Sequence, residues 1–120
     1  MTTVTFVKPN VKENVKYRGE IVDYTADAER YILRIYVSIE KEPSIRFMKR
    51  VDVELEKNSY FYRLCNELEV LENDMKADLD LLIGTRVVIT LKKGRGKKFY
   101  VNKIKLDEQY YQQQQEKESE

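Results

Sequence analysis

The chain has 120 residues, enough for one domain, and its 42% hydrophobic and 36% charged residues are typical of a globular protein with a strongly charged surface. It contains no His and a single Cys, which excludes a Cys/His zinc site, a catalytic Ser-His or Cys-His pair and an intrachain disulfide. No apolar run approaches the length of a membrane span, and the first residues do not have the shape of a signal peptide. We therefore expect a cytoplasmic protein with no membrane contact, no enzymatic activity, no metal and no cofactor.

Three strands are predicted in the first half of the chain, over residues 15–24, 30–39 and 45–56. In the first of them, Gly19 indicates a bulge or a sharp bend. The second strand has the clearest alternation, which predicts a core-facing side made of Tyr31, Leu33, Ile35, Val37 and Ile39. Polar loops over residues 25–29 and 40–44 separate the three strands.

After residue 58 the apolar spacing changes from two to about 3.6 residues, which predicts one helix capped by Asn58 or Ser59. The apolar side of this helix consists of Phe61, Leu64, Cys65, Leu68 and Leu71. A polar break over residues 73–78 and a short apolar stretch over residues 79–83 follow, and Gly84 ends that stretch. Two more strands are predicted over residues 85–91 and 99–106, joined by a flexible hairpin loop over residues 92–98.

This order of elements predicts an all-β fold with one helix, in the form of a five-stranded OB-fold Greek-key barrel whose helix lies between strands 3 and 4. An open α+β sheet with the same helix lying across it is the alternative. We assign residues 1–106 to an OB-fold nucleic-acid-binding domain and residues 107–120, which are acidic and rich in Gln, to a disordered tail.

Charge is segregated between these two parts, although the whole chain has a net charge of only +1. The tail carries five acidic residues and one Lys, a net charge of −4, so residues 1–106 carry +5. Within the domain, residues 86–105 include eight basic residues and no acidic one. A basic module next to an acidic tail often accompanies nucleic-acid binding, although a solvated charged surface is the simpler alternative.

Part of the second half also resembles a known family. Residues 81–92, LLIGTRVVITLK, followed by residues 98–104, KFYVNKI, are similar to the C-terminal half of small phage-type OB-fold single-stranded DNA-binding proteins. In that group a short apolar turn and a Gly precede strand 4, and an aromatic-x-Asn strand closes the barrel. The resemblance implies single-stranded DNA as the partner, a role in phage-like DNA replication or recombination, and a homo-oligomer (dimer or tetramer). The acidic tail would contact replication or recombination proteins, but it ends in Glu-Ser-Glu instead of the apolar tip of many bacterial members.

Single strands are bound without sequence preference by cations that follow the phosphates and by aromatic rings on which bases stack. The chain offers three such groups, one each on the second strand, the third strand and the last hairpin. The candidate residues are Arg30, Arg34, Tyr36, Arg46, Phe47, Lys49, Arg50, Lys92, Lys93, Arg95, Lys97, Lys98 and Phe99.

Each group has a purely structural alternative. Arg30, Arg34 and Tyr36 are predicted to emerge together on one face of the second strand, where ordinary cross-strand pairing would also explain them. Phe47 fits the core as well as the binding surface, and the basic loop fits a simple hairpin. The leading functional hypothesis is a single-stranded DNA-binding protein. The alternative is an OB-like protein-interaction adaptor or structural virion component that does not bind nucleic acid.

Overall fold

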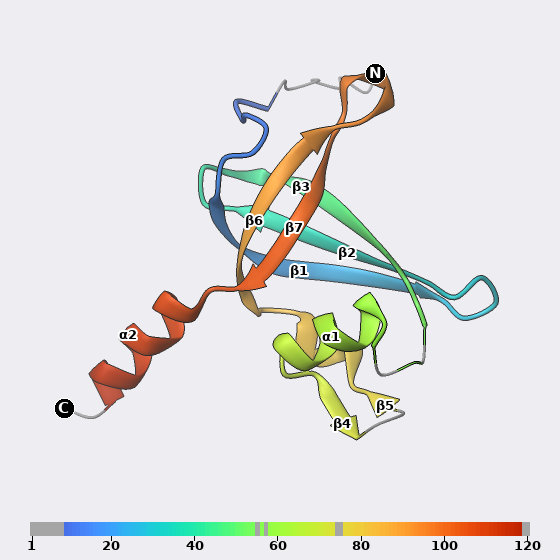
Figure 1. Cartoon of the computed structure of the whole chain (residues 1–120). Helices are drawn as coiled ribbons and strands as arrows, with labels where there is room; N and C mark the ends of the chain where they lie inside the picture. Colours follow the sequence, from blue (N-terminus) through green and yellow to red (C-terminus); the bar gives the residue numbers. More distant parts are fainter. Residues whose placement is uncertain (1–8, 55, 57, 74–75, 119–120) are drawn as a thin grey trace, which may run out of the picture.

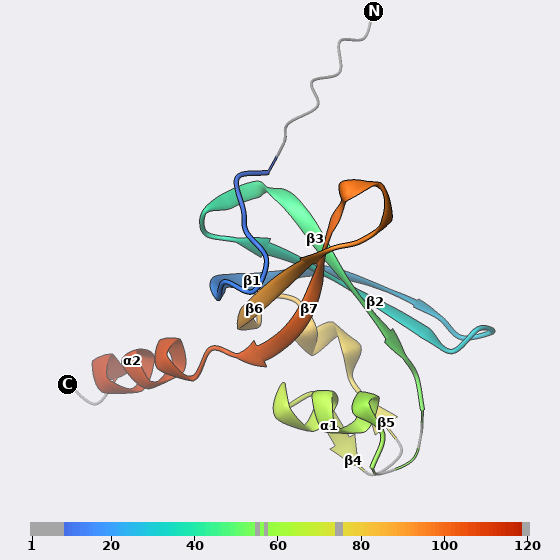
Figure 2. The same ribbon diagram turned by 45° about the horizontal axis from the view of Figure 1, so that its top comes forward.

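The computed structural model describes residues 9–54, 56, 58–73 and 76–118, and its main element is one five-stranded antiparallel sheet (Figure 1). The strand order is β3-β2-β1-β6-β7. The strands span β1 Tyr17–Asp27, β2 Ile32–Ile39, β3 Glu42–Asp52, β6 Arg86–Lys93 and β7 Phe99–Leu106. The sheet is strongly bent, so that β6 and β7 cross the β1–β3 layer in both views (Figures 1 and 2). This arrangement is compatible with a small β-barrel-like fold.

Strand β1 joins the two halves of the sheet. Its first residues pair with both neighbours, β2 and β6, whereas its second half, Asp23–Asp27, pairs with β2. The register shifts at Val22, which is a β-bulge between Ile21 and Asp23. The sequence predicted a bulge or a sharp bend at Gly19, and the register shift lies three residues later. Gly19 is required for a different reason, because a Cβ atom there would lie 2.2 Å from the backbone oxygen of Ser38 in β2.

The core lies between the two crossing layers and follows the predicted alternation. Leu33, Ile35, Val37 and Ile39 are all buried on the inner face of β2. They pack with apolar residues of the other strands, including Ile21, Val51, Val87, Ile89, Leu91 and Val101. Tyr31 was predicted to belong to this face, and that prediction is wrong. It lies in the β1–β2 turn with φ of 56°, outside the strand, and is 60% exposed.

A helix and a small hairpin cover one end of the core. Helix α1 spans Tyr60–Glu67, and its N-cap is Ser59, whose Oγ accepts a hydrogen bond from the backbone N–H of Tyr62 at 3.1 Å. Three members of the predicted apolar side, Leu64, Cys65 and Leu68, are buried, and Phe61 is partly buried against them. Leu71 was predicted to belong to the helix but lies in a strand. The hairpin consists of β4 Leu71–Asn73 and β5 Lys76–Ala77, and the short 3₁₀ helix η1 Leu79–Leu82 follows it.

The third predicted strand ends earlier than expected. Strand β3 stops at Asp52, and Leu55, which was expected within it, lies outside the described residues. The loop predicted over residues 40–44 is a short turn, because β3 already begins at Glu42. In contrast, the last strand has the predicted bounds.

The prediction of a single helix is wrong. Residues that were assigned to a disordered tail form a second α-helix, α2 Glu108–Glu118, which leads away from the sheet (Figures 1 and 2). Its start is attached to the sheet through Asp107, which is 2% exposed. One carboxylate oxygen of Asp107 accepts a hydrogen bond from Arg18 Nε at 2.8 Å, and the other accepts from the backbone N–H of Tyr110 at 3.1 Å. The bond to Asp107 also raises the pKa of Arg18.

Two rings extend this attachment. The hydroxyl of Tyr111 accepts a hydrogen bond from the backbone N–H of Arg86 in β6 at 2.9 Å. The guanidinium of Arg86 lies 4.9 Å from the centre of the Tyr110 ring. The first turn of α2 is therefore docked against β1 and β6. None of the helices in the described ranges is long and apolar enough to cross a membrane.

We predict that Asp107→Ala lowers the free energy of unfolding by about 1 kcal/mol more than Asp107→Asn does. Asn keeps an oxygen that can cap α2, whereas Ala removes the cap, and both variants lose the charge that faces Arg18. Urea denaturation measures the difference, and far-ultraviolet circular dichroism reports the helix. Equal stability of the two variants would show that Asp107 does not cap α2.

Candidate nucleic-acid interface

The outer face of β2 and β3 carries three arginines in adjacent register. Arg34 lies opposite Arg50, Tyr36 opposite Met48, and Ser38 opposite Arg46. These residues alternate with the buried ones of β2 and therefore point away from the core. We refer to Arg34, Tyr36, Arg46 and Arg50 as the arginine face.

Charges on the arginine face are poorly compensated. Two like charges directly opposite each other destabilise a sheet, and this is the position of Arg34 and Arg50. Arg46 pairs with Asp23 at 3.6 Å and Arg50 with Asp52 at 3.6 Å, but both arginine side chains are more than half exposed. Exposed pairs of this kind contribute about 0.2–1 kcal/mol each. An incoming phosphate can therefore replace either carboxylate at little cost.

Arg30 does not join this face. It lies in the turn between β1 and β2, where its Nε is 3.8 Å from Asp27 Oδ2 and its side chain is 76% exposed. The prediction that Arg30, Arg34 and Tyr36 emerge together is therefore correct for the two strand residues only. The left-handed backbone at Tyr31 interrupts the alternation between Arg30 and the strand.

Phe47 and Lys49 belong to the inner side of β3. Phe47 is 3% exposed and lies opposite Val37, so its alternative assignment to the core is the correct one. The ammonium of Lys49 donates a hydrogen bond to the backbone oxygen of Asn102 in β7 at 2.8 Å and lies 5.2 Å from the centre of the Tyr60 ring. Burial lowers the pKa of Lys49. In this structure Lys49 links the edge strands β3 and β7 instead of pointing outward with the arginine face.

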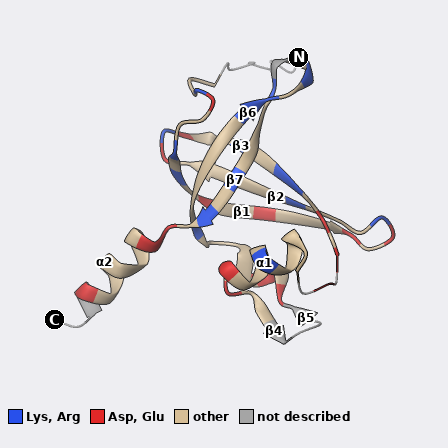
Figure 3. Ribbon diagram, viewed as in Figure 1, with Lys and Arg blue, Asp and Glu red and all other residues tan. Residues whose placement is uncertain are grey.

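The hairpin between β6 and β7 presents the second group of cations. Its tip is closed by the hydrogen bond from Gly94 N–H to Lys98 O at 2.8 Å, and Gly96 has a positive φ of 76°. The exposed cations of this hairpin are Lys92, Lys93, Arg95 and Lys98. The side chain of Lys97, which was also a candidate, lies outside the described part of the structure. Figure 3 shows basic residues along this hairpin, along β7, and on β2 and β3.

The ring that the hairpin exposes is not the one that was predicted. Phe99 is partly buried against the core, and Lys93 Nζ lies 5.4 Å from its centre. Tyr100 is 40% exposed and lies opposite Lys92 on the outer face. The sequence alone could have indicated that Tyr100 is the exposed ring. Neighbouring side chains of a strand face opposite sides, so an apolar, core-facing Val101 puts Tyr100 on the outer side.

Comparison with known proteins adds no assignment to this surface. No family model matches the sequence, and no curated protein shows a significant match to it. The functional argument therefore rests on the chemistry and geometry of the residues themselves.

Proposed function

We propose that the protein binds single-stranded DNA without sequence preference and serves DNA replication or recombination of a phage-like system in the cytoplasm. The observation that carries this proposal is the arginine face, where three arginines surround one partly buried tyrosine on the outer surface of the sheet. Guanidinium groups bind phosphate oxygens in a planar, bidentate manner, and a ring between them provides a surface on which a base can stack.

The strand order supports the more specific proposal of an OB-fold. The order β3-β2-β1-β6-β7, with α1 between β3 and β6 in the chain, is the order expected for a five-stranded Greek-key barrel of this type. The contact between Lys49 and Asn102 favours closure, because it joins the two edge strands. In such a barrel, oligonucleotides bind to strands 2 and 3 and to the loop between the last two strands. The arginine face and the β6–β7 hairpin occupy these positions.

Fluorescence anisotropy of a labelled oligo-dT strand, titrated with the full-length protein at low and at high salt, tests the proposal. We expect binding at low salt that weakens as salt rises, because the displaced counterions make phosphate contacts salt-dependent. The absence of binding at low salt would contradict the proposal and favour the protein-interaction adaptor.

Tyr36→Ala is predicted to weaken oligo-dT binding by about 1–3 kcal/mol, since it removes one stacking surface. Tyr36→Phe is the matched control and is predicted to bind like the wild type, because it keeps the ring. Tyr36 lies on the outer face, so both variants should fold, which thermal unfolding verifies. Equal affinity of Tyr36→Ala and the wild type would remove this ring from the site.

A further inference from the structure

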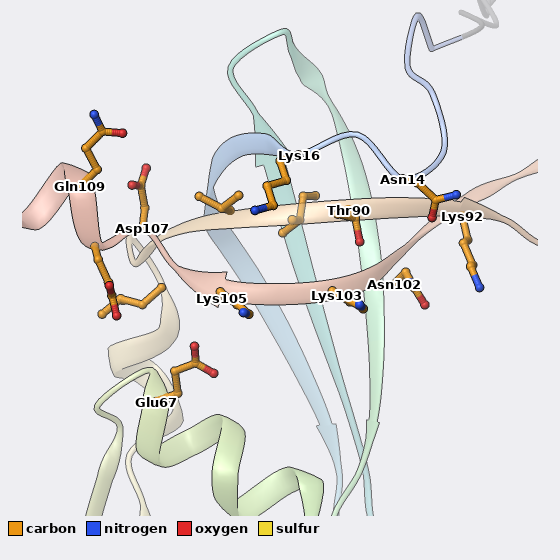
Figure 4. A pocket seen from close by; sticks show the side chains of 14 residues that line it. Asn14, Lys16, Glu67, Thr90, Lys92, Asn102, Lys103, Lys105, Asp107 and Gln109 are labelled. Atoms are coloured by element: carbon orange, nitrogen blue, oxygen red, sulfur yellow. The ribbon is translucent and has the colours of Figure 1, made fainter.

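A basic groove that includes no residue of the arginine face lies on the outer side of β6 and β7. It is a groove of about 890 Å³, open to solvent, and four lysines line it, namely Lys16, Lys92, Lys103 and Lys105 (Figure 4). We refer to it as the lysine groove. None of the predicted site residues except Lys92 belongs to it.

Strand register brings these lysines together. Lys103 lies opposite Thr90 and Lys105 opposite Val88, so both lysines of β7 project from the outer face beside short, uncharged neighbours. Lys16 immediately precedes β1. The chain before it is held along β6 by a hydrogen bond from the backbone N–H of Asn14 to the backbone oxygen of Leu91 at 3.1 Å.

The lysine groove has an uncompensated positive charge along the strands. In the part of the chain that the structure describes, none of its four lysines has a carboxylate within ion-pair distance. Three acidic residues, Glu67, Asp107 and Glu108, line the groove as well, and Asp107 is already bonded to Arg18. They come from α1 and from the start of α2, so the positive charge is concentrated along β6 and β7 (Figure 4).

The chemistry of the lining indicates phosphates and not bases. Among the described residues that line the groove, none is aromatic. The exposed ring of Tyr100 lies opposite Lys92, at the end of the groove that adjoins the hairpin. Ammonium groups bind phosphates as point charges. Lys92 belongs both to this groove and to the β6–β7 hairpin, which makes the groove continuous with the site of the proposed function.

We propose that the lysine groove binds the sugar-phosphate backbone of the same DNA strand where it continues beyond the arginine face and the hairpin. This inference rests on the proposed function and extends it. One section of the DNA strand then stacks its bases on Tyr36, and a second section is held through its phosphates alone. The acidic end of the groove, formed by Glu67 and Glu108, directs the strand away from α1 and α2 by repulsion.

The test uses the full-length variant Lys103→Gln/Lys105→Gln and the matched control Lys12→Gln/Arg63→Gln. All four residues are exposed, the two variants lose the same charge, and the control residues lie outside the groove, the arginine face and the hairpin. Binding is measured by anisotropy on oligo-dT of about six and about twenty nucleotides, lengths near and beyond the site sizes of single OB folds.

We expect the groove variant to weaken binding to the long strand by on the order of tenfold and to flatten its salt slope by about 1.4 units, because each phosphate contact contributes about 0.7. Binding to the short strand, which fits on the arginine face, should be unchanged. A long strand that lacks bases should show the same loss with the groove variant and no loss with Tyr36→Ala.

Three results would overturn the inference while leaving the proposed function intact. They are an unchanged salt slope on the long strand, an equal loss in the control variant, and an equal loss on the short strand. A change of oligomeric state in the groove variant, measured by light scattering, would instead identify the groove as a contact between copies of the chain. If the wild type binds neither strand, the proposed function itself fails.

Discussion

Replacing Lys92, Lys93, Arg95 and Lys98 of the β6–β7 hairpin with Gln is expected to reduce the slope of log K against log salt by about three units. Each phosphate contact on a single strand contributes about 0.7 to that slope, and the hairpin presents these four cations on exposed positions. We expect this to be the largest effect on binding among the variants considered, because it removes four contacts at once. Anisotropy titrations of oligo-dT at several salt concentrations measure the slope.

The matched control keeps the charge. In the variant Lys92→Arg/Lys93→Arg/Lys98→Arg, the hairpin retains all of its cations, and we expect the wild-type slope within about half a unit. Since Lys93 lies over the Phe99 ring, thermal unfolding of both variants must show that the hairpin still packs. An intact fold with the wild-type slope in the Gln variant would exclude the hairpin from the site.

Gly19→Ala is expected to have the largest effect on stability, with a loss of about 3 kcal/mol or more in the free energy of unfolding. The added Cβ would lie 2.2 Å from Ser38 O and 3.0 Å from Ile39 Cα, and both are backbone atoms that a side-chain rotation cannot move. Strand β1 pairs with both of its neighbours near Gly19, so a shift there disturbs the whole sheet. Against a typical total stability of about 5–15 kcal/mol, this loss is severe.

Gly94→Ala provides the comparison for urea denaturation. A Cβ at Gly94 would lie 3.4 Å from the Tyr100 ring, an ordinary contact, and its φ is negative. We therefore expect its free energy of unfolding to stay within about 0.5 kcal/mol of the wild type, as for most surface substitutions. If the Gly19→Ala variant has the same free energy of unfolding as the Gly94→Ala variant, β1 and β2 can move apart at Gly19 without loss of stability.

Local patterns in the sequence were sufficient for the elements whose structure depends on near neighbours. The two-residue alternation correctly predicted that one side of β2 faces the core, because every second side chain of a strand points the same way. The residues on that side are Leu33, Ile35, Val37 and Ile39. The pair Asn58 and Ser59 located the start of α1, because the side-chain oxygen of either residue can accept from a free N–H of the first turn, and Ser59 is the one that does so. The excess of cations near the last hairpin was also visible in the sequence, because charge does not depend on the fold.

Only the tertiary structure decided the positions of charged residues that lie on an inner side or are buried. Lys49 lies on the inner side of β3, a position that is tolerable because the backbone oxygen of Asn102, 53 residues later, accepts its hydrogen bond. Asp107 is buried because it meets Arg18, which is 89 residues away in sequence, and this contact anchors a helix in a segment that composition alone marks as disordered. The lysine groove arises in the same way, from β6, β7 and the chain before β1. Such contacts join distant residues, and the spacing of neighbouring residues carries no information about them.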